Sequence, residues 1–377
     1  MAKRAHGEGT ISKRQDGTYE GKISLGVDAE GKRKRKTVYG KTQKEVRAKI
    51  DEVKQQLANG TFSDTKLTVK AYLGQWLSHK EKQVKPRTAE LYRHLVMFHI
   101  VPDIGGKRLD KLTPLDIQNM VSSVALRGGI RTANMCRTTL FSAMKQALRW
   151  GLIPRNPVDA VDALKETKQE MSLWTSAEAV TFLDAARSHR LYALFYLAMA
   201  TGMRRGELLG LRWADVKDGA LHIRQSLTVV NNQIAISVPK TEKGKRRVAV
   251  SLDVETVLSD HRNRQEAERH VLGTLWPEND LVFRTEVGTP IHPRNLERTW
   301  YALQKKAGVT KVRLHDLRHL HASLAIRQGM DAKVLADRLG HSRASFTLDV
   351  YTHLFDEQRA NSAVSLSVLL GNQGPKN

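Results

Sequence analysis

The sequence predicts a multidomain α+β fold in three parts. These are a small N-terminal three-stranded sheet plus a helix, an all-α middle domain, and a mainly α C-terminal domain with a small antiparallel sheet. Three observations support this prediction: short β-type segments separated by turn signals in residues 1–60, helical periodicity in residues 61–165, and long apolar helical segments around one β-rich stretch in residues 174–370. A chain of 377 residues is long enough for two or three domains.

The N-terminal part reads as a β-meander followed by a helix. Its predicted strands cover residues 9–14, 18–27 and 32–39. The pairs Asp16-Gly17 and Glu30-Gly31 are typical of the turns that connect antiparallel strands. A helix is expected from Thr42 to Ala58, because Asn59-Gly60 supplies a stop signal. Residues 61–66 then read as a linker.

The middle part reads as four helices. They are expected over residues 69–80, 86–99, from 113 onward, and 131–150. Pro114 suits the first turn of the third helix, and Gly151 with Pro154 ends the fourth. The aromatic side chains Tyr72, Trp76 and Trp150 are interpreted as core residues. A segment rich in Lys, Glu and Gln at 163–173 reads as a linker to the last part.

The C-terminal part begins with a capping box, because Thr175 precedes Glu178 by three residues. One three-stranded sheet is predicted from segments 221–230, 233–239 and 246–252, with Asn231-Asn232 and Lys243-Gly244 as its turns. Helices fill most of the remainder. Residues 360–370 form a further apolar helical segment, and residues 371–377 are expected to be disordered.

Charge indicates the class of partner. The chain carries 62 Lys and Arg against 39 Asp and Glu, a net charge of +23. Such an excess of cations favours a polyanionic partner, most simply a nucleic acid. A ribosome-associated or merely basic protein is the alternative, and charge alone does not separate DNA from RNA.

Cysteine content and hydropathy indicate a soluble cytoplasmic protein. Cys136 is the only cysteine, which excludes an internal disulfide and a cysteine zinc site. The N-terminus is basic but lacks the apolar region of a signal peptide. The longest apolar run, residues 191–200, is shorter than the roughly 18 residues of a membrane span.

A set of separated polar residues suits attack on a phosphodiester by a protein hydroxyl. Arg204 lies in TGMRRGELLGL, Arg318 in HDLRH, and Tyr351 ten residues after His341. Arginine holds phosphate oxygens bidentately and stays charged, as a site without metal needs. Tyrosine can act as a covalent nucleophile, and a lysine or histidine can serve as general acid. His315 and His319 could form a metal pair, but no third ligand is evident, so metal binding is not expected.

Five motifs occur in one order along the chain: TGMRRGE, a lysine in a β-hairpin, HDLRH, LGH and YTH. This order resembles the signature of tyrosine recombinases, most closely that of the lambda-type integrases of phages and conjugative transposons. A single motif of this kind is weak evidence for a family, but five motifs in the family's order are specific evidence. The motifs lie in residues 174–355, and the whole chain matches the three-part layout of those integrases.

The resemblance implies a role for each matching residue. Arg204 resembles the first catalytic arginine, and Glu207, three residues later on the same helical face, its acidic support. His315 and Arg318 match the His-x-x-Arg pair of the family.

The remaining catalytic roles follow from the same resemblance. His341 matches a position that is histidine or tryptophan in the family, and Tyr351 is similar to the nucleophile that forms a 3′-phosphotyrosyl link. Lys240 resembles the hairpin lysine that protonates the leaving 5′ oxygen, although Lys243 and Lys245 share that hairpin.

DNA contacts are expected outside the catalytic part as well. The third predicted strand carries five consecutive cations, Lys32, Arg33, Lys34, Arg35 and Lys36. A sheet can enter a major groove, and these cations would contact phosphates there; the alternative is a solvated edge that discourages strand pairing. In the middle part, the expected DNA contacts are Lys85, Arg87, Arg131 and Arg137.

The resemblance implies a site-specific DNA recombinase that integrates and excises a mobile element. Residues 1–60 would bind arm-type DNA sites, residues 61–165 would form the core-binding (SAM-like) domain, and residues 174–370 the catalytic domain. The expected partners are double-stranded attachment sites, three further copies in a homotetramer, an excisionase and a host DNA-bending protein. No ATP, metal or other cofactor is expected, because the covalent link conserves the bond energy. The 360–370 helix would dock on a neighbouring protomer or on its own domain.

The sequence leaves alternative functions open. Residues 322–339 also fit a helix-turn-helix, which would make the protein a non-catalytic DNA-binding regulator. A Xer-like resolvase or a type IB topoisomerase would use the same chemistry. The basic N-terminal part favours the integrase reading over a resolvase.

Overall fold

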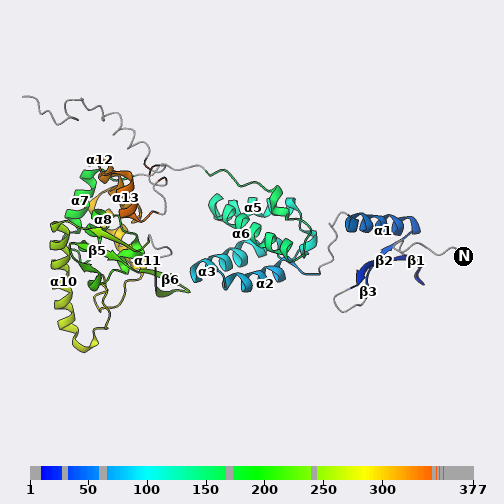
Figure 1. The fold of residues 1–377 in the computed structure, drawn as a ribbon, viewed down its shortest axis with the longest axis horizontal. Helices are drawn as coiled ribbons and strands as arrows, with labels where there is room; N and C mark the ends of the chain where they lie inside the picture. Colours follow the sequence, from blue (N-terminus) through cyan, green and yellow to red (C-terminus); the bar gives the residue numbers. More distant parts are fainter. Residues whose placement is uncertain are drawn as a thin grey trace, which may run out of the picture. The chain divides into compact units, whose positions relative to one another are not determined.

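The computed structural model describes residues 10–27, 33–58, 66–166, 173–238 and 244–341, together with 345, 348 and 351. The chain divides into two compact units, Met1–Lys168 and Gln169–Asn377 (Figure 1). No helix in the described ranges is long and apolar enough to cross a membrane.

The first unit begins with an antiparallel sheet covered by one helix. The strands β1 (Thr10–Lys13), β2 (Tyr19–Val27) and β3 (Arg33–Gly40) pair in chain order, and α1 (Gln43–Ala58) follows. Ile23 on β2 forms a small core with Val46 and Ile50 of α1. Gly21 allows this close packing, because a Cβ atom there would lie 2.6 Å from a methyl carbon of Val46. These elements confirm the predicted meander and helix.

The second half of this unit is helical. Its helices are α2 (Val69–Glu81), α3 (Pro86–Leu95), α4 (Val101–Ile104), α5 (Pro114–Gly128) and α6 (Ile130–Arg149). They enclose a core of their own, in which Tyr72 and Trp76 are fully buried. Trp150 was wrongly predicted as a core residue: it is 40% exposed and contacts Tyr72 and His79 with its ring.

The helix predicted over residues 86–99 is also interrupted. After α3 the chain makes a π-helical turn, Val96–Ile100, before α4. Pro102 explains the change, because it has no N–H to bond the carbonyl of Phe98 and its ring would clash with that carbonyl in a regular α-helix. A wider turn removes the clash, and the N–H of Val101 bonds the carbonyl of Val96 instead.

The second unit packs helices around two small sheets. Its helices are α7 (Ser176–Ala186), α8 (Tyr192–Thr201), α9 (Arg205–Leu209), α10 (Leu252–Leu272), α11 (Pro293–Ala307), α12 (Asp316–Arg327) and α13 (Ala332–Leu339). The rings of Trp174, Phe182, Phe195 and Trp300 meet at the centre of its core. The predicted capping box of Thr175 and Glu178 is present at the start of α7.

The prediction of one three-stranded sheet in this unit was wrong. One sheet contains β4 (Val216–Lys217), β5 (Ala220–Ile223) and β8 (Arg246–Ala249); the hairpin of β6 (Ser226–Val230) and β7 (Gln233–Ser237) is separate. The chain leaves the first sheet at Gln225, whose side-chain amide donates to the carbonyl of Gly210. β6 then lies directly on α9, and Gly206 permits this approach, since a Cβ there would meet the Leu227 carbonyl oxygen at 2.6 Å. The predicted turn at Asn231-Asn232 is confirmed by its two positive φ angles.

Candidate active site

The end of α8 places Arg204 at the solvent-exposed edge of the site. Gly202 ends the helix with a φ of 63°, and a Cβ there would lie 2.7 Å from a side-chain carbon of Leu339. Arg204 follows Gly202 by two residues and caps α9. Its Nη1 donates to Oε1 of Glu207 at 2.8 Å, and its Nη2 donates to the carbonyl of Gly340 at 3.1 Å. With 41% of its side chain exposed, Arg204 can also reach a ligand.

Glu207 binds a second arginine that the sequence reading did not single out. Arg246 on β8 donates from Nη1 and Nη2 to the two carboxylate oxygens of Glu207, at 3.0 and 2.8 Å. Burial raises the pKa of Glu207, but the hydrogen bonds and charge of Arg246, with a contribution from Arg204, outweigh it and lower the pKa to about 2. The carboxylate therefore stays ionised between two cations.

The alternation of β8 could have revealed Arg246. Successive side chains of a strand point to opposite faces, so Arg246 shares a face with Val248, which is 1% exposed. An arginine on a buried face needs an acidic partner. The Nε of Arg246 also donates to the carbonyl of Arg338 at 2.7 Å, which joins β8 to α13.

Arg318 lies in the first turn of α12 and is 4% exposed. Its Nη1 donates to the carbonyl of Gly202 at 2.9 Å, and its Nη2 donates to the carbonyl of Leu339 at 2.7 Å. Burial, reinforced by the charge of Arg204, lowers its pKa to about 9, so it remains a cation at neutral pH. A buried cation held by backbone carbonyls is well suited to bind an anion.

The hydroxyl of Tyr351 meets α12 one residue beyond Arg318. Tyr351 is 2% exposed, and its oxygen lies 2.7 Å from Nδ1 of His319. Burial raises the pKa of Tyr351 to about 12, although the charge of Arg318 acts in the opposite direction. The ring of His315, one helical turn earlier, packs edge-on against His319 at 5.7 Å between centroids. The sequence analysis gave His319 no catalytic role; its spacing of four residues from His315 in HDLRH was the available signal.

His341 closes the site from the end of α13. Gly340 caps that helix with a φ of 69°, and its carbonyl accepts a hydrogen bond from Arg204. Burial, followed by the charges of Arg318 and Arg204, lowers the pKa of His341 to about 4. Its imidazole is therefore neutral at neutral pH. The structure thus brings together Arg204, Glu207, His315, Arg318, His341 and Tyr351 from segments about 150 residues apart.

The helix pair α12 and α13 builds this site. The two helices lie side by side, and Ala322, Ile326 and Leu335 pack with Tyr351 in one apolar cluster (Figure 1). The segment 322–339, which also fits a helix-turn-helix, is thereby part of the site's framework. Within the described ranges, no group of three His, Cys, Asp or Glu residues is placed to hold a metal ion.

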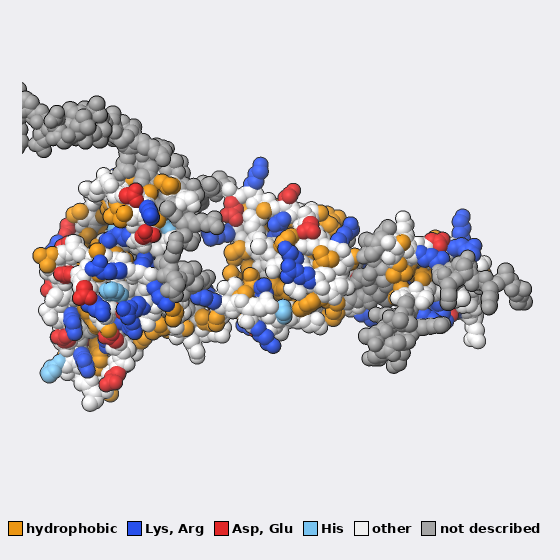
Figure 2. All heavy atoms as spheres, viewed as in Figure 1, with side chains coloured by type: hydrophobic (Ala, Val, Ile, Leu, Met, Phe, Trp, Pro, Cys, Tyr) orange, Lys and Arg blue, Asp and Glu red, His pale blue; other side chains and the backbone are white. Residues whose placement is uncertain are grey.

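The other predicted residues have mixed outcomes. Lys32 and Lys240 lie outside the described residues, as does the 360–370 segment. Arg33 and Lys34 belong to the backbone of β3, and Arg35 on the same strand is exposed while Lys36 is half-buried. Figure 2 shows many Lys and Arg side chains on the visible faces of both units.

The four basic residues predicted in the helical part differ in their contacts. Lys85 caps α3, and Arg87 forms an exposed ion pair with Glu90. Arg131 is exposed in the first turn of α6. Arg137 is half-buried, and its Nε donates to the carbonyl of Val161 at 2.5 Å. All four stay predictions as DNA contacts, but Arg137 also has a structural bond.

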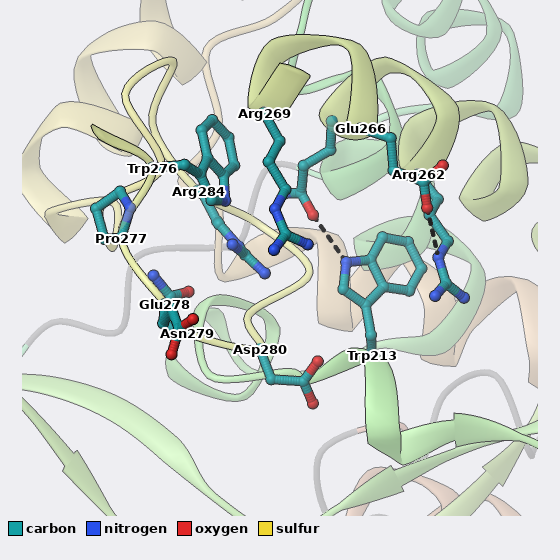
Figure 3. A pocket seen from close by; sticks show the side chains of 11 residues that line it. Trp213, Arg262, Glu266, Arg269, Trp276, Pro277, Glu278, Asn279, Asp280 and Arg284 are labelled. Atoms are coloured by element: carbon teal, nitrogen blue, oxygen red, sulfur yellow. Dashed lines mark hydrogen bonds and ion pairs between the residues drawn. The ribbon is translucent and has the colours of Figure 1, made fainter. Parts of the chain in front are cut away.

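A separate hollow of about 450 Å³ lies beside α10, lined by Trp213, Trp276 and Arg284 among others (Figure 3). It contains none of the residues predicted for catalysis. Its three arginines are balanced by three acidic side chains, so it lacks the excess of positive charge found around Arg318, where Arg204 and Arg246 also lie near Glu207.

Comparison with known proteins places the chain in a family. The phage integrase family model matches residues 172–358, and the model of the phage integrase N-terminal SAM-like domain matches residues 68–124. A tyrosine recombinase XerC-like protein of Caldanaerobacter subterraneus subsp. tengcongensis is 28% identical over 93% of this chain and 96% of its own. The ICEBs1 integrase of Bacillus subtilis is 27% identical over 96% of this chain and 100% of its own.

Solved structures show the same fold. The Tn1549 transposon integrase, in complex with a circular intermediate DNA, has a TM-score of 0.66 at 21% identity, covering 78% of this chain and 98% of that one. A lambda integrase dimer bound to a COC′ core site has a TM-score of 0.59 at 20% identity and covers 97% and 99% of the two chains. With ordered motifs, site geometry and both family models in agreement, the chain belongs to the phage integrase family of tyrosine recombinases, enzymes that exchange DNA strands.

Proposed function

We propose that this recombinase integrates and excises a mobile element by cutting and rejoining DNA at specific sites through a 3′-phosphotyrosine on Tyr351. One observation carries the proposal: the Tyr351 hydroxyl is buried beside a guanidinium, that of Arg318, which is anchored on backbone carbonyls. A nucleophile and a fixed cation in one site are what transfer of a phosphodiester to a protein hydroxyl requires.

The two arginines would hold the scissile phosphate. A guanidinium has five N–H donors, and the backbone bonds of Arg318 use two of them. The guanidinium of Arg204 is oriented by Glu207 and remains partly exposed to solvent. Together they would meet the non-bridging oxygens, where negative charge grows in the transition state. His341, neutral at this position, would donate one further hydrogen bond.

Proton transfer to the leaving group would be the task of Lys240. The oxygen of Tyr351 forms a bond to phosphorus, the bond from phosphorus to the 5′ oxygen breaks, and that oxygen takes a proton. Lys240 is proposed as its source because it resembles the hairpin lysine of the family. His315 lies at an exposed position of the site, where it can contact the phosphate or share in proton transfer.

Assembly and partners are proposed from the same family. A lambda integrase tetramer has been solved on a Holliday junction, and we propose that four copies of this chain act on two duplexes. Residues 1–60 would bind arm-type sites, residues 61–165 would grip the core site, and residues 174–370 would perform catalysis. An excisionase and a host DNA-bending protein would set direction, in the cytoplasm of a bacterial host.

The test is to trap the covalent intermediate. A nicked, end-labelled duplex with the candidate crossover site, taken from DNA flanking the gene, is incubated with wild type or Tyr351→Phe without added metal. A labelled, protease-sensitive band on a denaturing protein gel in wild type alone is the expected result. A Phe variant that still attaches to DNA would overturn the assignment of the nucleophile. Specific binding without any band in wild type would favour a regulator.

A further inference from the structure

The proton of the Tyr351 hydroxyl has a defined neighbour. Its oxygen lies 2.7 Å from Nδ1 of His319, whereas the residues proposed to handle protons are Lys240 and His315. The ring of His315 faces His319 edge-on, and no bond joins it to Tyr351 among the described residues. The family pattern of His-x-x-Arg ends at Arg318, so His319 falls just outside it.

The surroundings of His319 favour its neutral form, which is the form that can accept a proton. Burial lowers the pKa of His319, while the charge of Asp316 acts against this and those of Arg318 and Arg313 reinforce it. Among the described residues, His315 at the start of the same helix, His341 beyond α13 and Tyr351 itself also face it. A neutral imidazole with its proton on Nε2 presents a free electron pair at Nδ1, directly toward the phenol.

We propose that His319 is a catalytic residue that takes the phenolic proton of Tyr351 as the tyrosine attacks the phosphate, and returns it when the strand is rejoined. This inference rests on the proposed function and completes it. It leaves His315 free to contact DNA.

The step balances in both directions. As the bond from the Tyr351 oxygen to phosphorus forms, the phenolic proton moves to Nδ1 of His319. The bond from phosphorus to the 5′ oxygen breaks, and the leaving oxygen takes its proton from the general acid proposed above. In rejoining, the incoming 5′ hydroxyl gives its proton to that same group, the phosphotyrosine bond breaks, and the tyrosine oxygen recovers the proton from His319.

The phenol of Tyr351 is a much weaker acid than a protonated imidazole. This difference explains why proton transfer to His319 must accompany the attack on phosphorus. A phenol whose pKa is about 12 does not ionise beforehand next to a neutral imidazole. Its acidity increases as its oxygen bonds to phosphorus, and a base already in contact then gains the proton without rearrangement. The charge of Arg318 lowers the pKa of the same hydroxyl and so favours the loss of its proton.

The test compares His319→Asn with wild type in single-turnover attachment to the nicked duplex. The Asn amide oxygen can replace Nδ1 as a hydrogen-bond acceptor but cannot take a proton, so it separates positioning from base catalysis. We expect attachment to slow by roughly 10²–10³-fold and the limb of the pH–rate profile that reports the base to disappear. His321→Asn is the matched control, because it removes a buried imidazole from the same helix whose hydrogen bonds among the described residues go to the Met199 carbonyl and to Nε of Arg338.

A second substrate isolates the two proton transfers. Sulfur in place of the bridging 5′ oxygen leaves without protonation, so it compensates for loss of the general acid but not of the base. The His319→Asn defect should persist on this substrate, whereas a Lys240→Ala defect should largely disappear.

The outcomes are distinct. Wild-type rate and pH profile in His319→Asn, rescue of that variant by sulfur, or equal losses in His319→Asn and His321→Asn would each overturn the role of His319. Absence of attachment in wild type would instead count against the proposed function itself.

Discussion

The helical part of the first unit and the catalytic unit each bury a tyrosine, but the two hydroxyl groups meet different partners. Tyr72 donates to the backbone carbonyl of Ala143, and burial raises its pKa. Tyr351 is also buried with a raised pKa, yet its hydroxyl meets the imidazole of His319, and the charge of Arg318 lowers its pKa in part. A carbonyl can only accept a hydrogen bond, whereas an imidazole can also take the proton. Burial alone therefore does not distinguish the proposed nucleophile from a structural tyrosine; the hydrogen-bond partner does.

The same two regions also differ in how each uses a buried or half-buried arginine. Arg137 in the helical part and Arg318 in the catalytic unit both donate to backbone carbonyls. Arg318 joins the ends of α8 and α13, and Arg204 and His341 converge on the same place. In the helical part, the bond of Arg137 ties α6 to Val161, a buried residue of the same helical core. The same kind of hydrogen bond supports the fold in one region and holds the candidate active site together in the other.

The largest expected effect separates the two tyrosines. Tyr351→Phe should reduce covalent attachment to DNA by roughly 10⁶-fold, to below detection, as for loss of a nucleophile. Tyr72→Phe should leave attachment unchanged and lower the free energy of unfolding by about 1 kcal/mol, because only one hydrogen bond is lost. Attachment assays and urea unfolding of both variants check this. Loss of attachment in Tyr72→Phe without unfolding would break the comparison.

The next effect separates the two arginines. Arg318→Lys keeps the charge but loses the planar donor geometry, and we expect attachment to slow by roughly 10²–10³-fold. Arg137→Lys should change attachment little. Single-turnover rates measured at saturating DNA test the pair, with thermal unfolding as the control for folding. Equal rates in wild type and Arg318→Lys would show that charge alone suffices.

A stability effect of smaller size is expected from Glu207. Its pKa is lowered from 4.5 to about 2 in the folded protein, so its contribution is complete above pH 4.5 and is lost as the pH falls toward 2. The shift corresponds to roughly 3 kcal/mol. Urea unfolding of wild type between pH 7 and 2 should show this loss, and Glu207→Gln should not show it in that window. An unchanged pH dependence in Glu207→Gln would assign the acid sensitivity to other groups.

Protonation of His321 should lower the stability of the fold over a second, higher pH range in the same unfolding experiment. The pKa of His321 is lowered from 6.5 to about 4, mainly by burial and also by the charge of Arg338. The folded state therefore binds fewer protons than the unfolded state between these values, and stability should fall as the pH decreases from 6.5 to 4. His321→Asn should flatten that part of the curve.

The smallest effect concerns DNA affinity in the helical part. Arg131→Ala should reduce the slope of log affinity against log salt by about 0.9, the contribution of one phosphate contact. Arg137→Ala, which first loses a backbone hydrogen bond, should mainly lower the free energy of unfolding, by about 1 kcal/mol. Binding to a core-site duplex over a salt series distinguishes them. Equal changes of slope would mean that Arg137 also contacts phosphate.

Local signals predicted most elements of the fold. The turn pair Asp16-Gly17, the caps at Thr113 and Thr175, and Gly340 at the end of α13 act within a few residues, so their consequences can be read along the chain. The π-helical turn before Pro102 and the division of the second unit's sheet at Gln225 were missed. The first depends on relieving a clash within a helix, and the second on a bond to Gly210, fifteen residues earlier.

The sequence by itself determined which side chains are the candidates for the chemistry, because ordered motifs contain two arginines, two histidines and a tyrosine in one chain. Only the tertiary structure decided how they are held. Arg246 reaches Glu207 across 39 residues, Arg318 bonds the ends of two other helices, and His319 meets Tyr351 across 32 residues. Such contacts join segments that are distant in sequence, and the burial that sets their pKa values arises only when those segments pack together.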